Sequence, residues 1–281
     1  MSRPSVLLGA VAYDPKVTTI WHGFRSWLSR HGLDFDFVLY SQYERQVEDL
    51  IGGHIDVAWN SPLAWLRSVR LAAAAGRTVS AVAMRDTDRD LTSVVVVRAD
   101  SDVRQIGDLN GRTVAVGAVD SPQATLIPLA RLSQAGVAVV PRRFDIGVGM
   151  HGDHIGGERE AARALMSGDV HAACMIDANH VAFVKEGTLR PDDIRIVTQT
   201  APYDHCNLTT ASPNADGVRL LRDLLLSMSY GDAEVRPLLD LEGLTKWEPG
   251  RTTGYRTLDT AVDLLGFYSS DGRITAADYE P

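Results

Sequence analysis

Short apolar segments alternate with amphipathic segments along most of this chain, and this alternation restricts its fold more than any other feature. The first unit of the pattern predicts a strand at residues 5–11, a helix at 19–30 and a strand at 35–40. Apolar strands that alternate with helices are typical of a largely parallel sheet covered by helices on both faces. The sequence therefore predicts an α/β fold.

The same alternation divides the chain into two lobes. Residues 1–90 are expected to begin the first lobe, with a second helix opened by Ser41 and Glu44 at the spacing of a capping box. A valine run at 94–97 leads into a second lobe at 91–200, which includes an expected strand at 143–148. Residues 201–281 are expected to return to the first lobe, and the polar last dozen residues to trail on the surface.

Charge and hydropathy exclude several kinds of partner. The chain has 281 residues, a net charge of −8 and no run of basic residues. Nucleic acids and anionic membranes attract clustered Lys and Arg, so neither is an expected partner. No apolar run is long enough to cross a bilayer, and the first residues carry no export signal. We therefore expect a cytoplasmic protein without a transmembrane segment, exported only if a leader has been removed.

Two helix starts have nearly the same sequence, Asn-Ser-Pro at 60–62 and Asp-Ser-Pro at 120–122. Ser61 and Ser121 are preferred N-cap residues, and proline is preferred at the next position. The first N–H groups of a helix have no partner within it, so a helix start after a strand is a ready anion site. One such start in each lobe predicts lobes that close on one small anion. Three neighbouring side chains are candidate additional donors: Asn60, Gln123 and Thr125.

A glycine-rich segment at 149–158 concentrates polar side chains between an expected strand and helix. Such a segment at the carboxyl end of a strand faces the ligand crevice of an open α/β sheet. Histidine, cysteine and carboxylate groups are metal ligands, so one alternative is a zinc or iron site. The candidate ligands of that alternative are His151, His154, Glu158, His205 and Cys206. The other alternative is a site without metal.

Three segments resemble the phosphonate, phosphate and phosphite substrate-binding proteins of the type II periplasmic-binding-protein superfamily. They are a helix, glycine turn and Ile-Asp strand at 48–59, a valine strand followed by Asp-Leu-Asn-Gly at 94–115, and Gly-Met-His with a later Gly-Asp-Val turn at 149–170. The resemblance implies two lobes, two hinge crossings and a ligand cleft between the lobes. It further implies a small anionic ligand, phosphonate-, phosphate- or carboxylate-like, taken up with an ABC permease or sensed.

The same resemblance assigns roles to three residues. It implies that Tyr13 lines the cleft, that His151 contacts the ligand, and that Asp177 pairs with the amino group of an aminoalkyl ligand. No cofactor is required for such binding.

A second function remains open, because closure of two lobes also excludes water and positions acid–base groups. Cytoplasmic enzymes of the same superfamily include decarboxylases and dehydratases. In this alternative the chain is a lyase acting on a small acid, assisted by a divalent metal at the histidine-rich segment. Its catalytic residues are expected to be His151, His154, Asp177 and His205.

Overall fold

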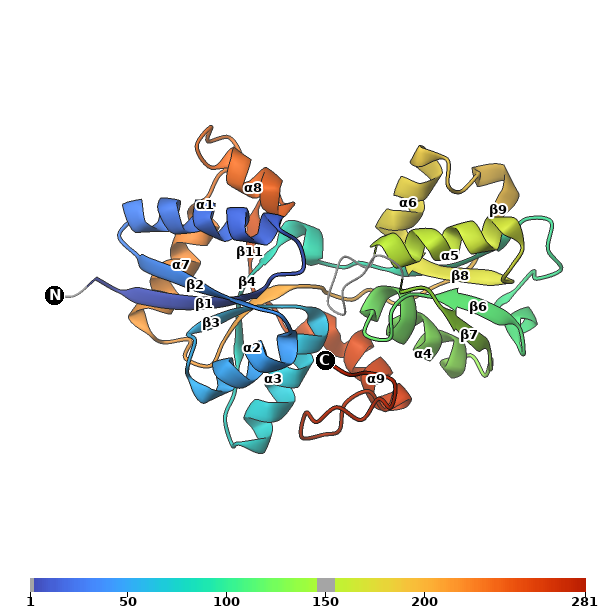
Figure 1. Ribbon diagram of the computed structural model, residues 1–281, viewed down its shortest axis with the longest axis horizontal. Coiled ribbons are helices and arrows are strands. Elements are labelled where there is room, and N and C mark those ends of the chain that lie inside the picture. The colour runs from blue at the N-terminus through green and yellow to red at the C-terminus, as the bar shows by residue number, and fades with distance from the viewer. Residues whose placement is uncertain (1–2, 146–154) are drawn as a thin grey trace.

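The computed structural model describes residues 3–145 and 155–281, and its strands form two sheets (Figure 1). The first sheet has the strand order β11-β4-β10-β3-β1-β2. Its strands are β1 (Ser5–Val11), β2 (Asp34–Tyr40), β3 (Val57–Asn60), β4 (Ser80–Arg85), β10 (Asn207–Thr210) and β11 (Trp247–Pro249). The second sheet has the order β7-β6-β8-β5-β9. Its strands are β5 (Ser93–Arg98), β6 (Thr113–Val116), β7 (Val140–Arg143), β8 (Ala172–Ile176) and β9 (Ile194–Gln199).

Helices cover both faces of each sheet. In the first lobe, α1 (Lys16–Arg30), α7 (Asp216–Ser227) and α8 (Arg236–Glu242) lie on one face, and α2 (Tyr43–Gly52) and α3 (Pro62–Ala74) on the other. In the second lobe, α5 (Ile155–Ser167) and α6 (Asp177–Glu186) lie opposite α4 (Ile127–Gln134). The last helix, α9 (Arg256–Leu265), packs against α4 beneath the junction of the lobes.

The sheets are mixed rather than largely parallel. β10 runs antiparallel to β3 and β4, and β5 runs antiparallel to β8 and β9. Both strands follow a segment that crosses between the lobes. The chain therefore enters each sheet at the strand ends that face the other lobe. β7 also differs from the expected strand at 143–148, because it is an exposed edge strand without the apolar signal used to place it.

The chain crosses between the lobes twice, at residues 86–92 and 200–206, and the two crossing segments pair with each other. Leu91 and Tyr203 exchange main-chain hydrogen bonds of 2.8 Å in each direction. Arg251 donates to Asp90 at 2.7 Å and to the fully buried Asp204 at 2.5 Å. One guanidinium group therefore links the two crossing segments. Gly254 lies against Asp204, and a Cβ at this position would come 2.0 Å from the carboxyl carbon. The hinge therefore has a fixed, hydrogen-bonded structure.

One apolar cluster spans the junction of the lobes. It combines residues of α3, such as Leu63 and Leu66, with Ile127 of α4 and with Leu258 and Val262 of α9. Burial of apolar surface between elements of both lobes favours the arrangement in which the lobes lie together. α9 and the segment after it therefore belong to the junction and not to one lobe alone.

Candidate functional site

A cavity of about 240 Å³ lies between the lobes. The ends of β1, β3 and β4 and the beginning of β10 meet at the edge of the first sheet that borders it. The residues that line it are Tyr13, Lys16, Tyr43, Glu44, Trp59, Ser61, Pro62, Leu63, Ala64, Arg85, Asp120, Pro122, Gln123, His205, Cys206, Tyr268 and Tyr279. Both lobes and the C-terminal segment therefore contribute to one site.

The first Ser-Pro helix start borders this cavity directly. Ser61 caps α3, and its hydroxyl oxygen accepts a hydrogen bond of 3.2 Å from the main-chain N–H of Ala64. Pro62 occupies the first helical position and has no N–H group to satisfy. Residues 61–64, which begin α3, line the cavity, so the positive end of the helix dipole lies beside it.

The second Ser-Pro helix start borders the same cavity from the other lobe. Ser121 accepts a hydrogen bond of 3.2 Å from the main-chain N–H of Ala124, but its side chain is fully buried. Its neighbours Asp120, Pro122 and Gln123 line the cavity in its place. Here the chain forms a π-helical turn, Pro122–Leu126, before α4 begins, where a continuous helix was expected.

Three cationic side chains from the first lobe and the hinge line the cavity: Lys16, Arg85 and His205. Arg85 lies over the Trp59 ring, 5.3 Å from its centroid. Burial disfavours the charged guanidinium, but Asp88 and Glu242 outweigh this effect and raise the pKa of Arg85. The Arg85 guanidinium therefore stays charged at neutral pH.

His205 is held in its charged form by its neighbours. Burial lowers the pKa of the imidazole, whereas the Cys206 sulfur and the Asp88 carboxylate raise it, to about 10 overall. Nδ1 of His205 lies 3.1 Å from Sγ of Cys206 and 3.6 Å from Oδ1 of Asp88. A protonated imidazole at the cavity wall is a hydrogen-bond donor suited to an anion.

Carboxylates and phenols also line the cavity. The Tyr279 hydroxyl donates a buried hydrogen bond of 2.9 Å to Oε1 of Glu44. Burial, followed by the charges of Glu44 and Asp120, raises the pKa of Tyr268, so these groups lie near one another. Cationic and acidic side chains therefore line the same cavity.

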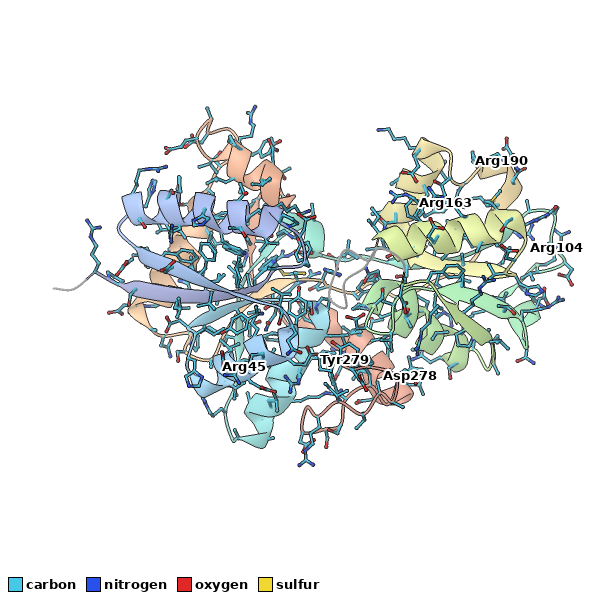
Figure 2. The ribbon with its side chains drawn as sticks, viewed as in Figure 1. Arg45, Arg104, Arg163, Arg190, Asp278 and Tyr279 are labelled. Atoms are coloured by element: carbon cyan, nitrogen blue, oxygen red, sulfur yellow. The ribbon has the colours of Figure 1, made fainter. Side chains whose placement is uncertain are left out.

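Two expectations about these residues were wrong. Glu44 is not part of a capping box with Ser41, because α2 begins after Gln42 and has no side-chain cap; Glu44 accepts from Tyr279 instead. The last residues do not trail on the surface either. Tyr279 is only 7% exposed, because burial of its ring against Phe267 and its bond to Glu44 fix the chain end. Figure 2 shows Tyr279 beside the first lobe and Asp278 further toward the second.

Asn60, expected as a ligand donor, lies outside the cavity lining. It is fully buried and joins a hydrogen-bonded network on the α2 and α3 side of the sheet. Its amide nitrogen donates to Ser68 at 3.1 Å and to Thr209 at 2.9 Å, and its oxygen accepts from Gln46 at 2.9 Å. These contacts use the groups that a ligand would need.

Thr125 and Asp177 also lie away from the lining of this cavity. The Thr125 hydroxyl donates to the main-chain oxygen of Ala118 at 2.7 Å and borders a separate pocket beside the C-terminal segment. Asp177 begins α6 and accepts a hydrogen bond of 2.7 Å from Thr92 at the hinge end of β5. Tyr13, Ser61, Gln123 and His205, by contrast, meet at the one cavity.

The expected histidine-rich site is described only in part, because His151 and His154 lie outside the described residues. Glu158 is fully buried in the second lobe, where it accepts from the main-chain N–H of Ile176 at 3.0 Å and from Asn179 at 2.9 Å. Burial raises the pKa of Glu158 to about 7, although these hydrogen bonds oppose the shift. The group that joins His205 and Cys206 is instead Asp88.

Sequence reasoning missed most of the charged and aromatic lining. Lys16 and Arg85 follow or end strands of the first sheet, and a rule that strand ends face the crevice would have found them. Tyr268 and Tyr279 come from the C-terminal segment, and no local signal predicts that it folds back to the cavity.

The fold and the cavity define a class of two-lobed proteins that hold a small ligand between their lobes. A family model described as "ABC transporter, phosphonate, periplasmic substrate-binding protein" matches residues 10–255. The chain belongs to this family. It is 27% identical to the phosphate-import protein PhnD of Mycolicibacterium smegmatis over 249 residues, which are 87% of this chain and 74% of that protein.

Solved structures share the fold. PhnD1 from Prochlorococcus marinus, in complex with methylphosphonate, has a TM-score of 0.66 at 16% identity and covers 94% of this chain and 98% of its own. XAC2383 from Xanthomonas citri, bound to ATP, has a TM-score of 0.67 at 18% identity and covers 92% of this chain and 96% of its own.

Membership of this family decides between the two functions left open by the sequence. The family consists of ligand-binding components of ABC transporters, so the chain binds a small anionic ligand in its interlobe cleft, and the lyase alternative is not supported. The family is described as periplasmic, which does not support the expected cytoplasmic location. Within the described residues, every helix is too short or too polar to span a bilayer.

Proposed function

We propose that this protein is exported, captures a small phosphonate in the interlobe cavity and delivers it to an ABC permease. In this proposal residues 1–90 and the returning chain at 201–281 make one lobe, with α9 and the segment after it packed at the junction, and residues 91–200 make the other. The observation that carries the proposal is that both Ser-Pro helix starts, and the cations Lys16, Arg85 and His205, border one cavity of about 240 Å³. Helix N-termini and cationic donors together favour a compact anionic group.

The acidic residues of the cavity lining restrict the class of ligand further. Glu44 and Asp120 place carboxylates there, beside the phenols of Tyr268 and Tyr279. A ligand with negative charge at both ends would be repelled by these carboxylates, whereas an ammonium group would be attracted. The proposed ligand is therefore an aminoalkylphosphonate, with its phosphonate at the helix starts and its amine toward Asp120.

Isothermal titration calorimetry of the full chain tests this proposal. The ligands are 2-aminoethylphosphonate, methylphosphonate, inorganic phosphate and methanesulfonate, at one pH and salt concentration. We expect 2-aminoethylphosphonate to bind most tightly. Tighter binding of inorganic phosphate would contradict the phosphonate assignment, and equal binding of the two phosphonates would contradict the role of the acidic residues.

A variant of Asp120 tests recognition of the amine separately from recognition of the phosphonate. Asp120→Asn keeps the size of the side chain and removes its charge. We expect it to weaken binding of 2-aminoethylphosphonate by about tenfold and to leave methylphosphonate binding unchanged or slightly stronger. Asp240→Asn, at an exposed position of α8 outside the cavity lining, is the matched control. Equal losses for both ligands would show that Asp120 does not contact the amine.

A further inference from the structure

Three potential metal ligands of different chemistry meet at the cavity wall. The carboxylate of Asp88, the imidazole of His205 and the sulfur of Cys206 each offer an atom within 4.8 Å of the other two. Within the described residues, no other group of three such side chains comes this close together. The cluster lies where β4 has just ended and β10 is about to begin.

The main chain holds these residues in place from both sides. The N–H of His205 donates to the main-chain oxygen of Asp88 at 2.8 Å, which joins the two segments. The oxygen of His205 accepts from the Tyr255 hydroxyl at 2.8 Å, and the same hydroxyl is bonded to Asn207 at 2.7 Å. A site with a fixed main chain loses little conformational entropy when an ion binds.

The distances are close to those of a coordination site. In a tetrahedral zinc site, neighbouring nitrogen, oxygen and sulfur ligands lie roughly 3.3–3.6 Å apart. Nδ1 of His205 lies 3.1 Å from the Cys206 sulfur and 3.6 Å from the Asp88 oxygen. The three ligand atoms all lie within 4.8 Å of one another.

Arg85 competes for Asp88, and the structure offers it other partners. It donates to the Asp88 carboxylate through Nε at 2.5 Å and Nη2 at 2.9 Å. Its Nη1 also donates to the main-chain oxygen of Glu242 at 2.9 Å. The guanidinium therefore keeps an acceptor when an ion takes one carboxylate oxygen.

Two of the three ligands face the cavity. His205 and Cys206 line it, whereas Asp88 is buried behind them at 2% exposure. An ion held by all three would have its remaining coordination position open to the cavity, as in zinc sites that bind a further ligand. Sulfur and imidazole donors select zinc, cobalt or nickel over magnesium and calcium.

We propose that Asp88, His205 and Cys206 bind a divalent transition-metal ion in the wall of the cavity, with one coordination position open to the ligand. Binding requires Cys206 as thiolate and His205 as neutral imidazole, so the ion displaces their protons to solvent. The site does not depend on the identity of the phosphonate, and it is tested without one.

Cobalt titration tests the site, because a thiolate bound to Co²⁺ gives a charge-transfer band in the near ultraviolet. Full-length protein, freed of metal with a chelator, is titrated with Co²⁺ and then with Zn²⁺. We expect the band to saturate at one equivalent, and Zn²⁺ to abolish it. Cys174→Ser is the matched control, because Cys174 is buried in β8 away from the cluster, and it should keep the band.

Cys206→Ser should lose the band and weaken Zn²⁺ affinity by more than about tenfold. Circular dichroism shows whether this variant folds, and His205→Gln, which keeps the sulfur, gives a second test with the same expected loss of affinity. A wild-type protein without a saturable band would overturn the proposal. Equal metal affinity in wild type, Cys206→Ser and His205→Gln would show adventitious binding elsewhere and would also overturn it.

Discussion

Ser61 and Ser121 make the same capping contact, each accepting at 3.2 Å from the N–H three residues further on. Their surroundings differ. The first helix start rests on a neutral network in which Asn60 joins Gln46 and Thr209. The second has ionisable neighbours, because Asp120 lines the cavity and Glu158 lies within hydrogen-bonding range of Gln123.

This difference shows how one local motif serves two purposes. The neutral network has no group that changes charge, so the first helix start is a fixed part of the anion site. The second combines a buried cap with Glu158, whose raised pKa makes its charge sensitive to the pH. We expect mutations at the first start to affect mainly folding, and mutations around the second to affect mainly ligand selectivity and pH response.

The largest expected effect is on the neutral network. Asn60→Ala removes hydrogen bonds to three buried partners and leaves their polar groups unsatisfied, so we expect a loss of about 2–4 kcal/mol in the free energy of unfolding. Chemical denaturation measures it. Asp120→Asn, at the matching position of the second start, should cost less than about 1 kcal/mol. Similar losses for both variants would break the comparison.

The next effect is a pH dependence at the second helix start. Burial raises the pKa of Glu158 to about 7 from its usual 4.5, so the folded state holds a proton that the unfolded state has lost between these values. The contribution of Glu158 to the free energy of unfolding is therefore fully present below pH 4.5. It decreases by ~3 kcal/mol as the pH rises through 7.

Glu158→Gln removes this dependence. Urea denaturation of wild type and variant at pH 4.5, 6 and 8 should show the variant gaining stability relative to wild type as the pH rises. His205 also titrates with a raised pKa and is present in both proteins; its charge opposes the shift of Glu158. Parallel pH profiles would contradict the assignment of a buried, neutral Glu158.

A smaller effect is expected when either capping serine is replaced, and the loss of stability should differ between the two caps. Ser121 is fully buried, so Ser121→Ala leaves the Ala124 N–H without a partner and should cost about 1–2 kcal/mol. Ser61 borders the cavity, where water can replace its oxygen, and Ser61→Ala should cost about 0.5–1 kcal/mol. Thermal unfolding without ligand gives both values, and the reverse order would argue against the difference in burial.

The smallest expected effect concerns the C-terminal segment, which contributes to the cavity lining. Tyr279→Phe removes the buried hydrogen bond to Glu44 and should cost about 1 kcal/mol. Tyr230→Phe is the control, because its bond to Asp240 is exposed and contributes little. A Tyr279 variant as stable as the Tyr230 variant would mean that the segment does not support this wall.

Local chemistry explains which features the sequence could predict. The Ser-Pro helix starts are visible because a cap and its helix lie within four residues of each other. The alternation of strands and helices likewise predicts two lobes, and the family resemblance predicts the cleft. Asn60 was assigned to the wrong environment because successive strand residues point to opposite faces, and its side chain faces Ser68 and Thr209.

Contacts between distant segments explain what the sequence could not predict. The bond between Tyr279 and Glu44 joins residues 235 positions apart, and Asp88 meets His205 only because two crossings pair. The packing of α9 against α4 and against the π-helical turn after Ser121 likewise joins segments far apart in the sequence. No pattern within one segment carries this information.

The central claim is that both helix starts hold one anion, and a crystal structure of the complex with methylphosphonate tests it most directly. The account predicts phosphonate oxygens about 3 Å from main-chain nitrogens in the first turns after both Ser61 and Ser121. A phosphonate bound at only one of these turns, or outside the cavity lined by Lys16 and Arg85, would contradict it.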